Sequence, residues 1–367
     1  MTPLALGGVA GLAAVGGGVA MLARPRAERR YRALAEETWR APRAVVPLLR
    51  ELVRCGTLAP NSHNTQPWRF AIRGQSEVTV QADPARRTPA VDPDDHHLHA
   101  SLGCAVETMM QAAPALGLRP EQVEDLPEGG VALRLRPVPV VVTALSEAIA
   151  RRRSTRSAMD PALPEGEALD ALARDGGSDP RVGCVLITAA AQRAALAELI
   201  IEGNRAQLRD RAFVAELLSW IRFGHRAALA RRDGLFAGSM GNPAVPEALG
   251  RLIFRAVFTE ARETDRLARV LAGTAGYAVF GAVQDGPAHW LAAGRAAQRF
   301  CLRATALGLA TAWVNQPVEV AALRPSLASL AGLGGRRPDL VLRFGRAPGL
   351  VPSLRRPLGD VLVETER

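Results

Sequence analysis

Two segments of this chain, 191 positions apart, are similar enough to indicate an internal repeat. Residues 103–118 align without a gap with residues 294–309, and seven of the sixteen positions are identical. The identities include the run Ala-Leu-Gly-Leu that ends both segments. Such self-similarity predicts two structurally related halves in one chain, arranged about a pseudo-two-fold axis like the subunits of a symmetric dimer. Chance similarity between two alanine-rich helices is the alternative.

The length of 367 residues suits one large or two modest globular units. Because 48% of the residues are hydrophobic and 22% are charged, the chain can bury a substantial core, which excludes a wholly disordered or collagen-like protein. The four cysteines are isolated in the sequence and predict buried thiols, not a disulfide framework or a metal cage. They are Cys55, Cys104, Cys184 and Cys301.

All 46 basic residues are arginines, and the formal net charge is +10. Arginine is suited to the bidentate capture of phosphate and carboxylate groups. Aromatic residues make up only 4% of the chain, and no basic run is interleaved with them. Nucleic-acid binding is therefore not expected.

The first 23 residues carry no charged side chain, and an arginine cluster follows over residues 24–32. This order predicts a single-span membrane anchor over residues 3–23, which would tether a cytoplasmic body to the inner face of the plasma membrane. The alternatives are a poorly ordered tail and the remnant of a signal sequence. Residues 1–42 are accordingly predicted to be an N-terminal segment that precedes the globular body.

Hydrophobic periodicity predicts both helices and strands, and hence a mixed α+β protein. The predicted helices span residues 43–58, 96–117, 165–174 and 191–230, with a further helix that begins near residue 146. A β-hairpin is expected around Gly74, and the other predicted strands begin near residues 131, 182, 311 and 339. The two halves are predicted to cover residues 43–145 and 146–367.

Arginines and a hydroxyl are concentrated at residues 152–156, and two more arginines lie near the C-terminus. The first group is Arg152, Arg153, Ser154 and Arg156, and the second is Arg355 and Arg356. Converging guanidinium groups and a hydroxyl are what a bound phosphate monoester needs. A solvated basic helix end is the alternative. Because the chain has no P-loop or GxGxxG motif after a strand, side chains and not a glycine-rich loop would hold the phosphate.

The loop over residues 61–68 combines amides, a hydroxyl and a Gln-Pro step before a predicted strand. Such a loop can hydrogen-bond to a flat heteroaromatic ring while Trp68 anchors the loop to the core. Ordinary turn chemistry is the alternative.

Both motifs resemble those of a known enzyme family. The segment 59–70, which reads APNSHNTQPWRF, resembles the PSSxNxQPW signature of the FMN-dependent nitroreductases, and Arg152–Arg156 is similar to their RxSxR/K phosphate-binding segment. Other residues resemble the Acg subfamily, whose members are single chains of two fused nitroreductase-like halves. These residues are Asp83, Arg87, Asp92, Pro93, Ser101, Gly103 and Ala105. The resemblance covers most of residues 43–362 and implies a nitroreductase-like fold with a helical lid insertion.

The resemblance also implies one FMN at the junction of the halves. The phosphate and ribityl chain would be held by Arg152, Arg153 and Ser154, with Arg355 and Arg356 as the C-terminal basic contact. The isoalloxazine would be covered from the opposite half by Pro60, Asn61, Ser62 and Asn64. Arg156 would face the pyrimidine edge of the flavin and, as the catalytic residue, stabilise charge on the reduced ring.

The chain departs from the family pattern at three places: Asn61 replaces the first serine of the loop, Asp94 and Asp95 stand where the subfamily usually has Gly-Arg, and the third is near residue 320. Val318 and Glu319 fall where the family has a Pro-x-Glu-Gly segment near flavin N5, but Val320 replaces the glycine and hinders close approach. The implied activity is hydride transfer from NAD(P)H through the flavin to a nitroaromatic, a quinone or a similar small molecule. The alternatives are a protein that sequesters FMN beneath a lid over residues 203–260, and an arginine-rich membrane-associated binding module. The chain would be a monomer with an internal pseudo-dimer, or a weak homodimer.

A cluster of acidic and histidine side chains precedes and opens the predicted helix at residue 96. It contains Asp94, Asp95, His96, His97 and His99. We expect a solvated helix N-terminus capped by Asp95, and no metal site. An apolar series at helical spacing, Phe213, Leu217, Trp220 and Phe223, is expected to belong to the core or to a lid helix.

Overall fold

The computed structural model describes residues 24–44, 47–127 and 129–363. The helices are α1 (Arg24–Thr38), α2 (Leu48–Thr57), α3 (His96–Ala112), α4 (Ala144–Arg151), α5 (Gly166–Gly176), α6 (Ala190–Arg209), α7 (Arg211–Trp220), α8 (His225–Arg231), α9 (Glu247–Val257), α10 (Glu260–Ala272), α11 (Pro287–Ala306), α12 (Gln316–Glu319), α13 (Arg324–Leu330) and α14 (Leu358–Val361). The strands are β1 (Trp68–Arg73), β2 (Glu77–Ala82), β3 (Leu118–Asp125), β4 (Val131–Pro137), β5 (Val182–Ile187), β6 (Ile221–Arg222), β7 (Leu235–Phe236), β8 (Gly276–Ala282), β9 (Ala310–Trp313), β10 (Leu340–Gly345) and β11 (Leu362–Val363).

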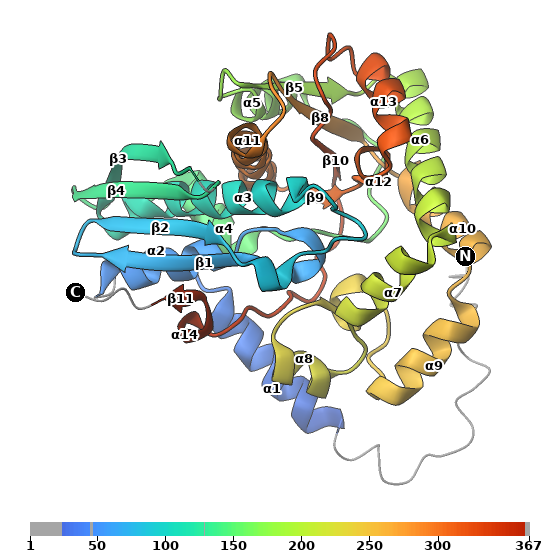
Figure 1. The fold of residues 1–367 in the computed structure, drawn as a ribbon, viewed down its shortest axis with the longest axis horizontal. Coiled ribbons are helices and arrows are strands. Elements are labelled where there is room, and N and C mark those ends of the chain that lie inside the picture. Colours follow the sequence, from blue (N-terminus) through green and yellow to red (C-terminus); the bar gives the residue numbers. More distant parts are fainter. Residues whose placement is uncertain (1–23, 45–46, 128, 364–367) are drawn as a thin grey trace.

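Two antiparallel sheets with the same strand order form the framework of the molecule (Figure 1). The first has the order β1-β2-β4-β3, and the second has the order β5-β8-β10-β9. In each sheet a helix lies in sequence between the second and third strands, α3 in the first and α11 in the second. A helix also precedes each first strand, α2 before β1 and α5 before β5. Both sheets therefore arise from the same succession of helices and strands.

Helices α3 and α11 pack side by side between the two sheets (Figure 1). A Cβ atom on Gly103 would overlap the carbonyl oxygen of Leu291, and one on Gly294 would overlap the carbonyl oxygen of Ala100. Gly103 and Gly294 are 191 positions apart, and so are Ala100 and Leu291, the same shift as in the sequence repeat. The two contacts are therefore equivalent, with the roles of the two helices exchanged. The repeated glycines are needed because they let the two backbones touch.

The N-terminal helix and the C-terminal tail pack against each other. The Tyr31 hydroxyl donates to the Pro352 carbonyl at 2.8 Å, and Trp39 Nε1 donates to the Ser353 carbonyl at 2.7 Å. Strand β11 then extends the first sheet by pairing in parallel with β1, with Leu362 opposite Phe70. The C-terminal segment thus joins the sheet of the first half.

A long insertion separates β5 from β8, whereas the equivalent strands β1 and β2 are joined by a short turn. The helical stretch predicted over residues 191–230 is present as three helices, α6, α7 and α8. The first break arises because the Asp210 side chain accepts a hydrogen bond from the Ala212 amide at 2.8 Å and starts a new helix. The second lies at Ile221–Arg222, where the chain becomes extended and pairs with β7.

Several local predictions are confirmed. The hairpin forms as β1 and β2, and Gly117 ends the α3 region in the left-handed conformation with a φ of 71°. Strands β3 and β8 were missed, β8 because all seven of its residues are buried and alternation is therefore absent.

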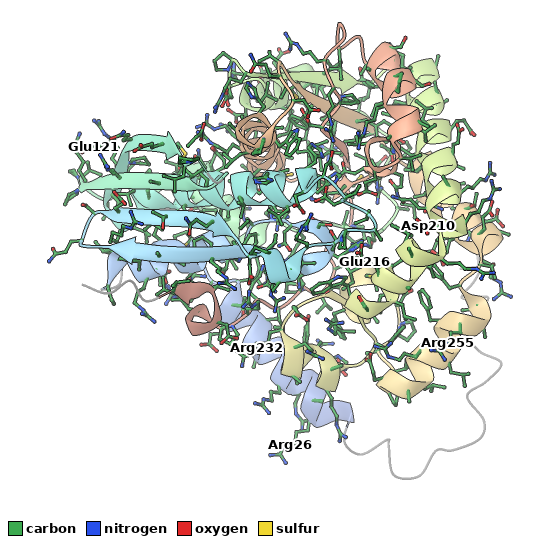
Figure 2. The ribbon with its side chains drawn as sticks, in the orientation of Figure 1. Arg26, Glu121, Asp210, Glu216, Arg232 and Arg255 are labelled. Carbon is green, nitrogen blue, oxygen red and sulfur yellow. The ribbon has the colours of Figure 1, made fainter. Side chains whose placement is uncertain are left out.

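Charged side chains such as Arg26, Glu121 and Arg255 lie on the outside (Figure 2).

The predicted membrane anchor falls outside the described residues. Within residues 24–44, 47–127 and 129–363, no helix combines the length and the apolar character needed to cross a bilayer.

Candidate active site

Two adjoining cavities, of about 500 and about 100 Å³, lie between the loop after α2, the segment after α4 and the insertion. Residues that line both are Pro60, Asn61, His63, Arg156, Leu235, Met240 and Trp313. The two motifs singled out in the sequence therefore share one crevice, although they are some 90 residues apart. We call the two spaces the large cavity and the small cavity.

The small cavity is strongly positive. Its lining includes Arg152, Arg153, Arg156 and Arg355, and among the described residues no aspartate or glutamate lines it. Burial, followed by the charge of Arg152, lowers the pKa of Arg153 to about 10 and that of Arg355 to about 9. Desolvation and mutual repulsion both disfavour the charged forms. An anion bound among these guanidinium groups would relieve both effects, so the small cavity is suited to a phosphate.

The ring of Trp39 packs against the guanidinium groups of three of these arginines. Its ring centroid lies 4.0 Å from the guanidinium carbon of Arg153, 4.9 Å from that of Arg355 and 5.7 Å from that of Arg152. Cation–π attraction of this kind holds the positive groups together without a carboxylate. Trp39 was missed from the sequence because it lies in the stretch assigned to the N-terminal segment, and a lone tryptophan carries no motif.

A buried ion pair fixes the chain on either side of Trp39. Arg40 binds Glu51 of α2 through two hydrogen bonds of 2.6 Å, and Arg54 binds the same carboxylate at 2.8 Å. Although burial opposes ionisation, these hydrogen bonds lower the pKa of Glu51 below 4.5. The carboxylate therefore stabilises the fold at neutral pH.

Glu51→Gln is expected to lower the free energy of unfolding by about 2 kcal/mol at pH 7, because a charged hydrogen-bond acceptor is lost from a buried site. The folded-state pKa lies below the unfolded value of 4.5, so the difference from wild type should persist above pH 4.5 and shrink as the pH falls below it. Urea unfolding at several pH values measures this. Glu121→Gln, on an exposed ion pair with Arg136, serves as the control and should change stability by less than about 0.5 kcal/mol. An equal loss in both variants would contradict the prediction.

The segment after α4 is held extended against β9. Ser154 forms a β-bridge with Thr311, and the Thr155 amide donates to the Thr311 carbonyl at 3.0 Å. Arg152 donates to the Leu58 carbonyl at 3.1 Å and to Ser154 Oγ at 3.4 Å. This backbone pairing holds the segment beside the small cavity, which Arg152, Arg153 and Ser154 all line.

The two C-terminal arginines have different surroundings. Arg355 directs every N–H at the protein, and its acceptors are the carbonyls of Thr57, Leu58, Ala59 and Leu354, Asn64 Oδ1 and Ser353 Oγ. Arg355 thus ties the C-terminal tail to the loop after α2. Arg356 lines neither cavity: it lies 3.7 Å from Asp83 and donates to the Asp360 carbonyl at 2.7 Å.

The loop after α2 adopts an uncommon backbone. His63, Asn64 and Gln66 have φ values of 46°, 54° and 56°, in the left-handed region that favours glycine. Each such residue costs about 1–3 kcal/mol unless its surroundings compensate. Asn61 Oδ1 accepts from the Gln66 amide at 2.8 Å, and Asn64 Nδ2 donates to the Gly234 carbonyl at 3.0 Å. The loop is therefore locked to itself and to the insertion.

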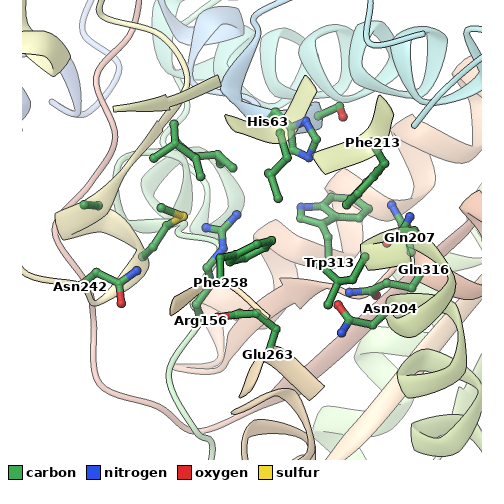
Figure 3. Close-up of a pocket in the computed structure, with 18 of the residues that line it drawn as sticks. His63, Arg156, Asn204, Gln207, Phe213, Asn242, Phe258, Glu263, Trp313 and Gln316 are labelled. Carbon is green, nitrogen blue, oxygen red and sulfur yellow. The ribbon is translucent and has the colours of Figure 1, made fainter. Parts of the chain in front are cut away.

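His63 and Arg156 point into the large cavity from opposite sides (Figure 3). Burial, then the charges of Arg156 and His97, lower the pKa of His63 to about 4, so its imidazole is neutral. Arg156 has no hydrogen-bond or ion-pair partner among the described residues. The Arg156 side chain is exposed, and its guanidinium is cationic at neutral pH. It is thus a cation available to a ligand.

The insertion supplies an apolar wall to the large cavity. The aromatic residues of this wall are Phe213, Phe223, Phe254 and Phe258, and the last two are stacked with centroids 4.1 Å apart. Trp220 does not join them: its ring centroid lies 6.0 Å from the guanidinium carbon of Arg86 and 5.8 Å from that of Arg222. Three members of the predicted apolar series, Phe213, Leu217 and Phe223, thus line the cavity, and Trp220 does not.

The amides of Asn204, Gln207 and Gln316 gather at another edge of the large cavity, where α6 and α12 meet (Figure 3). Gln207 Nε2 donates to Glu319 Oε2 at 2.5 Å, and Asn204 and Gln316 lie beside them. Burial raises the pKa of Glu319. Val318 lines neither cavity and is buried in the core behind this edge. Of this group only Glu319 was predicted from the sequence, because Asn204 and Gln207 lie on a distant helix that carries no motif.

The expectation of a solvated N-terminus for α3 was wrong. His96 and His97 are buried, with 1% and 7% of their surface exposed. Asp92, and not Asp95, accepts the free amides, those of His97 at 3.0 Å and Leu98 at 2.9 Å. Asp95 instead binds Arg87 at 2.6 Å. Asp94 is exposed, but His96 is buried because Trp290 of α11 and Asp339 lie against its ring, which a local pattern does not reveal.

Three of these side chains are close enough together to be considered as metal ligands. Asp92, His96 and His97 offer ligand atoms within 4.8 Å of one another. However, both Asp92 oxygens accept backbone amides, and His96 Nε2 lies 3.1 Å from Asp339. Burial lowers the pKa of His96 and raises that of Asp339 to about 7, as in a neutral hydrogen-bonded pair. A metal ion would have to displace these partners.

No family model matches the chain. Sequence comparison finds a relative in Mycobacterium tuberculosis strain H37Rv, named "Putative NAD(P)H nitroreductase Rv3131", and its counterpart in strain CDC 1551. Each is 30% identical over 346 residues, which cover 86% of this chain and 90% of the relative. The chain belongs to the nitroreductase family.

The chain is also similar to solved nitroreductase structures, at low sequence identity. One from Desulfitobacterium hafniense with bound FMN is 15% identical, with a TM-score of 0.38 over 62% of this chain and 100% of that chain. NfnB from Mycobacterium smegmatis in complex with NADPH is 18% identical, with a TM-score of 0.39 over 61% of this chain and 98% of that chain. The predicted mixed α+β fold is confirmed by the observed helices and sheets.

Proposed function

We propose that this nitroreductase-family protein binds FMN and transfers hydride from NAD(P)H to a small-molecule acceptor such as a quinone or a nitroaromatic. The observation that carries the proposal is the small cavity, where four guanidinium groups converge without a carboxylate beside a larger cavity with an apolar wall. The first space matches a phosphate, and the second, at about 500 Å³, is within the usual size of a cofactor site. The name of the M. tuberculosis relative supports NAD(P)H as the donor.

Each predicted residue has a part in this proposal. Arg152, Arg153 and Ser154 would hold the phosphate, and Arg355 would position the covering loop. Pro60, Asn61 and Ser62 would lie over the ring, with Asn64 fastening their loop to the insertion, and Glu319 would border the ring's far edge. Arg356 and Val318 would support the surroundings without touching the cofactor.

Arg156 would act electrostatically. FMN, when bound, supplies hydride transfer between a nicotinamide and an acceptor. Arg156 is cationic, has no protein partner among the described residues and lines both cavities. A fixed positive charge at this place stabilises negative charge that develops on a bound ring. The insertion would exclude water, which strengthens that interaction.

We further propose that residues 43–145 and 146–367 are two nitroreductase-like halves, as in the Acg-like proteins. The identical strand order of the two sheets and the reciprocal glycine contacts between α3 and α11 support this. A single duplication would explain both the shared strand order and the paired glycines, because each half contributes one four-stranded run and one of the two helices.

A specific observation favours a second function, the sequestration of FMN. The insertion is fastened to the loop by reciprocal bonds between Asn64 and Gly234, each of 3.0 Å, and by Gln66 Nε2, which donates to the Arg232 carbonyl at 2.9 Å. A lid held in this way hinders the access of a second substrate. The protein would then store the cofactor without turnover.

Reduction of the purified protein distinguishes the two functions. We expect a yellow protein whose flavin absorbance is bleached by NADH or NADPH under anaerobic conditions and recovers when a quinone or a nitroaromatic is added. This outcome follows from ping-pong hydride transfer through one site. A yellow protein that neither nucleotide bleaches would support sequestration. A colourless protein that does not bind added FMN would contradict both proposals.

A further inference from the structure

A buried Asp92–His97 pair lies at the start of α3, on the wall of the large cavity. His97 is only 7% exposed, and it is among the residues that line the cavity. Its Nδ1 lies 3.5 Å from Asp92 Oδ1. Its Nε2 is buried and has no hydrogen-bond partner among the described residues. A buried nitrogen without a partner points to a group that the protein chain itself does not supply.

Asp92 is held firmly in place. Its two oxygens accept the backbone amides of His97 and Leu98, so the carboxylate cannot turn away from the imidazole. A carboxylate beside Nδ1 fixes the tautomer and orientation of the ring and leaves Nε2 for chemistry. The Ser101 hydroxyl, one turn later, donates to the His97 carbonyl at 2.6 Å and steadies the same turn.

The charges around His97 favour its protonated form. The groups that face it are Asp92 and Asp94 from the preceding loop, His96 on its own helix, Glu319 on α12, and His63 and Asp339. Burial opposes the charge, but the bond to Asp92 and the carboxylates of Asp92, Glu319 and Asp94 raise the pKa of His97 above 6.5. Burial lowers the pKa of both His63 and His96. Of these three imidazoles, His97 is thus the one whose surroundings favour the protonated form.

The proposed reaction needs one such proton. A hydride brings two electrons and one proton to the acceptor, so a quinone is left with one oxygen that still requires a proton. The balanced conversion is NAD(P)H plus quinone plus one proton to NAD(P)⁺ plus hydroquinone. An acid on the cavity wall can supply that proton while water is excluded.

We infer that His97 donates this proton to the reduced acceptor and that Asp92 is its positioning residue. This inference rests on the proposed function. The Nε2–H bond breaks, the nitrogen keeps the electron pair, and a new O–H bond forms on the acceptor. The neutral imidazole then takes a proton from solvent before the next turnover.

The oxidative half-reaction isolates this step. The FMN-loaded protein is reduced anaerobically with one equivalent of NAD(P)H and mixed with excess quinone in a stopped-flow instrument. We expect the wild-type rate to be constant at low pH and to fall tenfold per pH unit above the pKa of His97. In His97→Gln the rate should fall about 10²-fold, the lower end for general acid catalysis, and lose this pH dependence. FMN affinity and the rate of reduction by NAD(P)H should be unchanged.

His99→Gln is the matched control. His99 lies on the same helix, its Nδ1 contacts the Asp95 carbonyl at 2.9 Å, and it lines neither cavity. Its oxidative rate and pH profile should equal those of wild type. Asp92→Asn should keep the oxidative rate at low pH. The pH at which this rate begins to fall should be lower than in wild type, because the imidazole loses the negative charge beside it.

A second readout does not depend on activity. In protein with ¹⁵N-labelled histidine, NMR should show the imidazole of His97 titrating above pH 6.5, and titrating at lower pH in Asp92→Asn. A yellow, reducible His97→Gln protein with the wild-type rate and pH profile would overturn the inference alone. A colourless wild type, or one that NAD(P)H does not bleach, would instead overturn the proposed function, and the inference with it.

Discussion

The double variant Arg152→Ala/Arg153→Ala is expected to fold but to purify without flavin colour. These two guanidinium groups line the small cavity, where no carboxylate among the described residues competes for them. Each charge-assisted contact to a phosphate contributes about 1.5–3 kcal/mol, so the loss of two should weaken FMN binding by roughly 10²–10⁴-fold. Titration of the apoprotein with FMN, followed by flavin fluorescence, measures the dissociation constant.

Two comparisons test whether the phosphate is responsible. Riboflavin lacks the phosphate, so the preference of wild type for FMN over riboflavin should largely disappear in the double variant. Arg295→Ala is the control, because Arg295 is a half-buried arginine that pairs with Glu107 and lines neither cavity. It should bind FMN like wild type. A double variant that loses FMN and riboflavin affinity equally would show that these arginines act on the fold and not on the phosphate.

Gly103→Ala and Gly294→Ala are each expected to destabilise the protein by about 3 kcal/mol, at the upper end of the usual cost of overpacking. In each variant the new Cβ overlaps a backbone carbonyl oxygen of the facing helix, which cannot move away unless the helix moves. Because both glycines lie at one crossing, a single shift of the helices relieves both overlaps, and the double variant should lose less than the sum. Urea denaturation gives the free energies of unfolding.

Gly166→Ala is the matched control for these substitutions. Gly166 begins helix α5, and a Cβ placed on it would have no atom within 4 Å. This variant should be stabilised by up to about 1 kcal/mol, because alanine forms helix more readily than glycine. If the two crossing variants behaved like this control, α3 and α11 would not pack as described.

Local features of the sequence were enough to predict the elements near the site. The alternation on either side of Gly74 produced the β1–β2 hairpin, and Gly117 ended its helix as expected. The shift of 191 positions located the two glycines that meet between α3 and α11. The motifs at residues 60–64 and 152–156 were recognisable because each is continuous in the chain. Information of this kind is local, and a sequence displays it directly.

The assignment of residues to the cavity depended on the tertiary structure. Trp39, Gln207 and His97 reach the crevice from three separate elements, and no pattern links them along the chain. Arg355 and Arg356 are adjacent, yet only the first lines the small cavity, because successive residues of an extended chain face opposite ways. His97 looked like part of a polar, solvated turn until the folded chain covered it. Burial and charge at a site are sums over neighbours that are distant in sequence, so they exist only once those neighbours have been brought together.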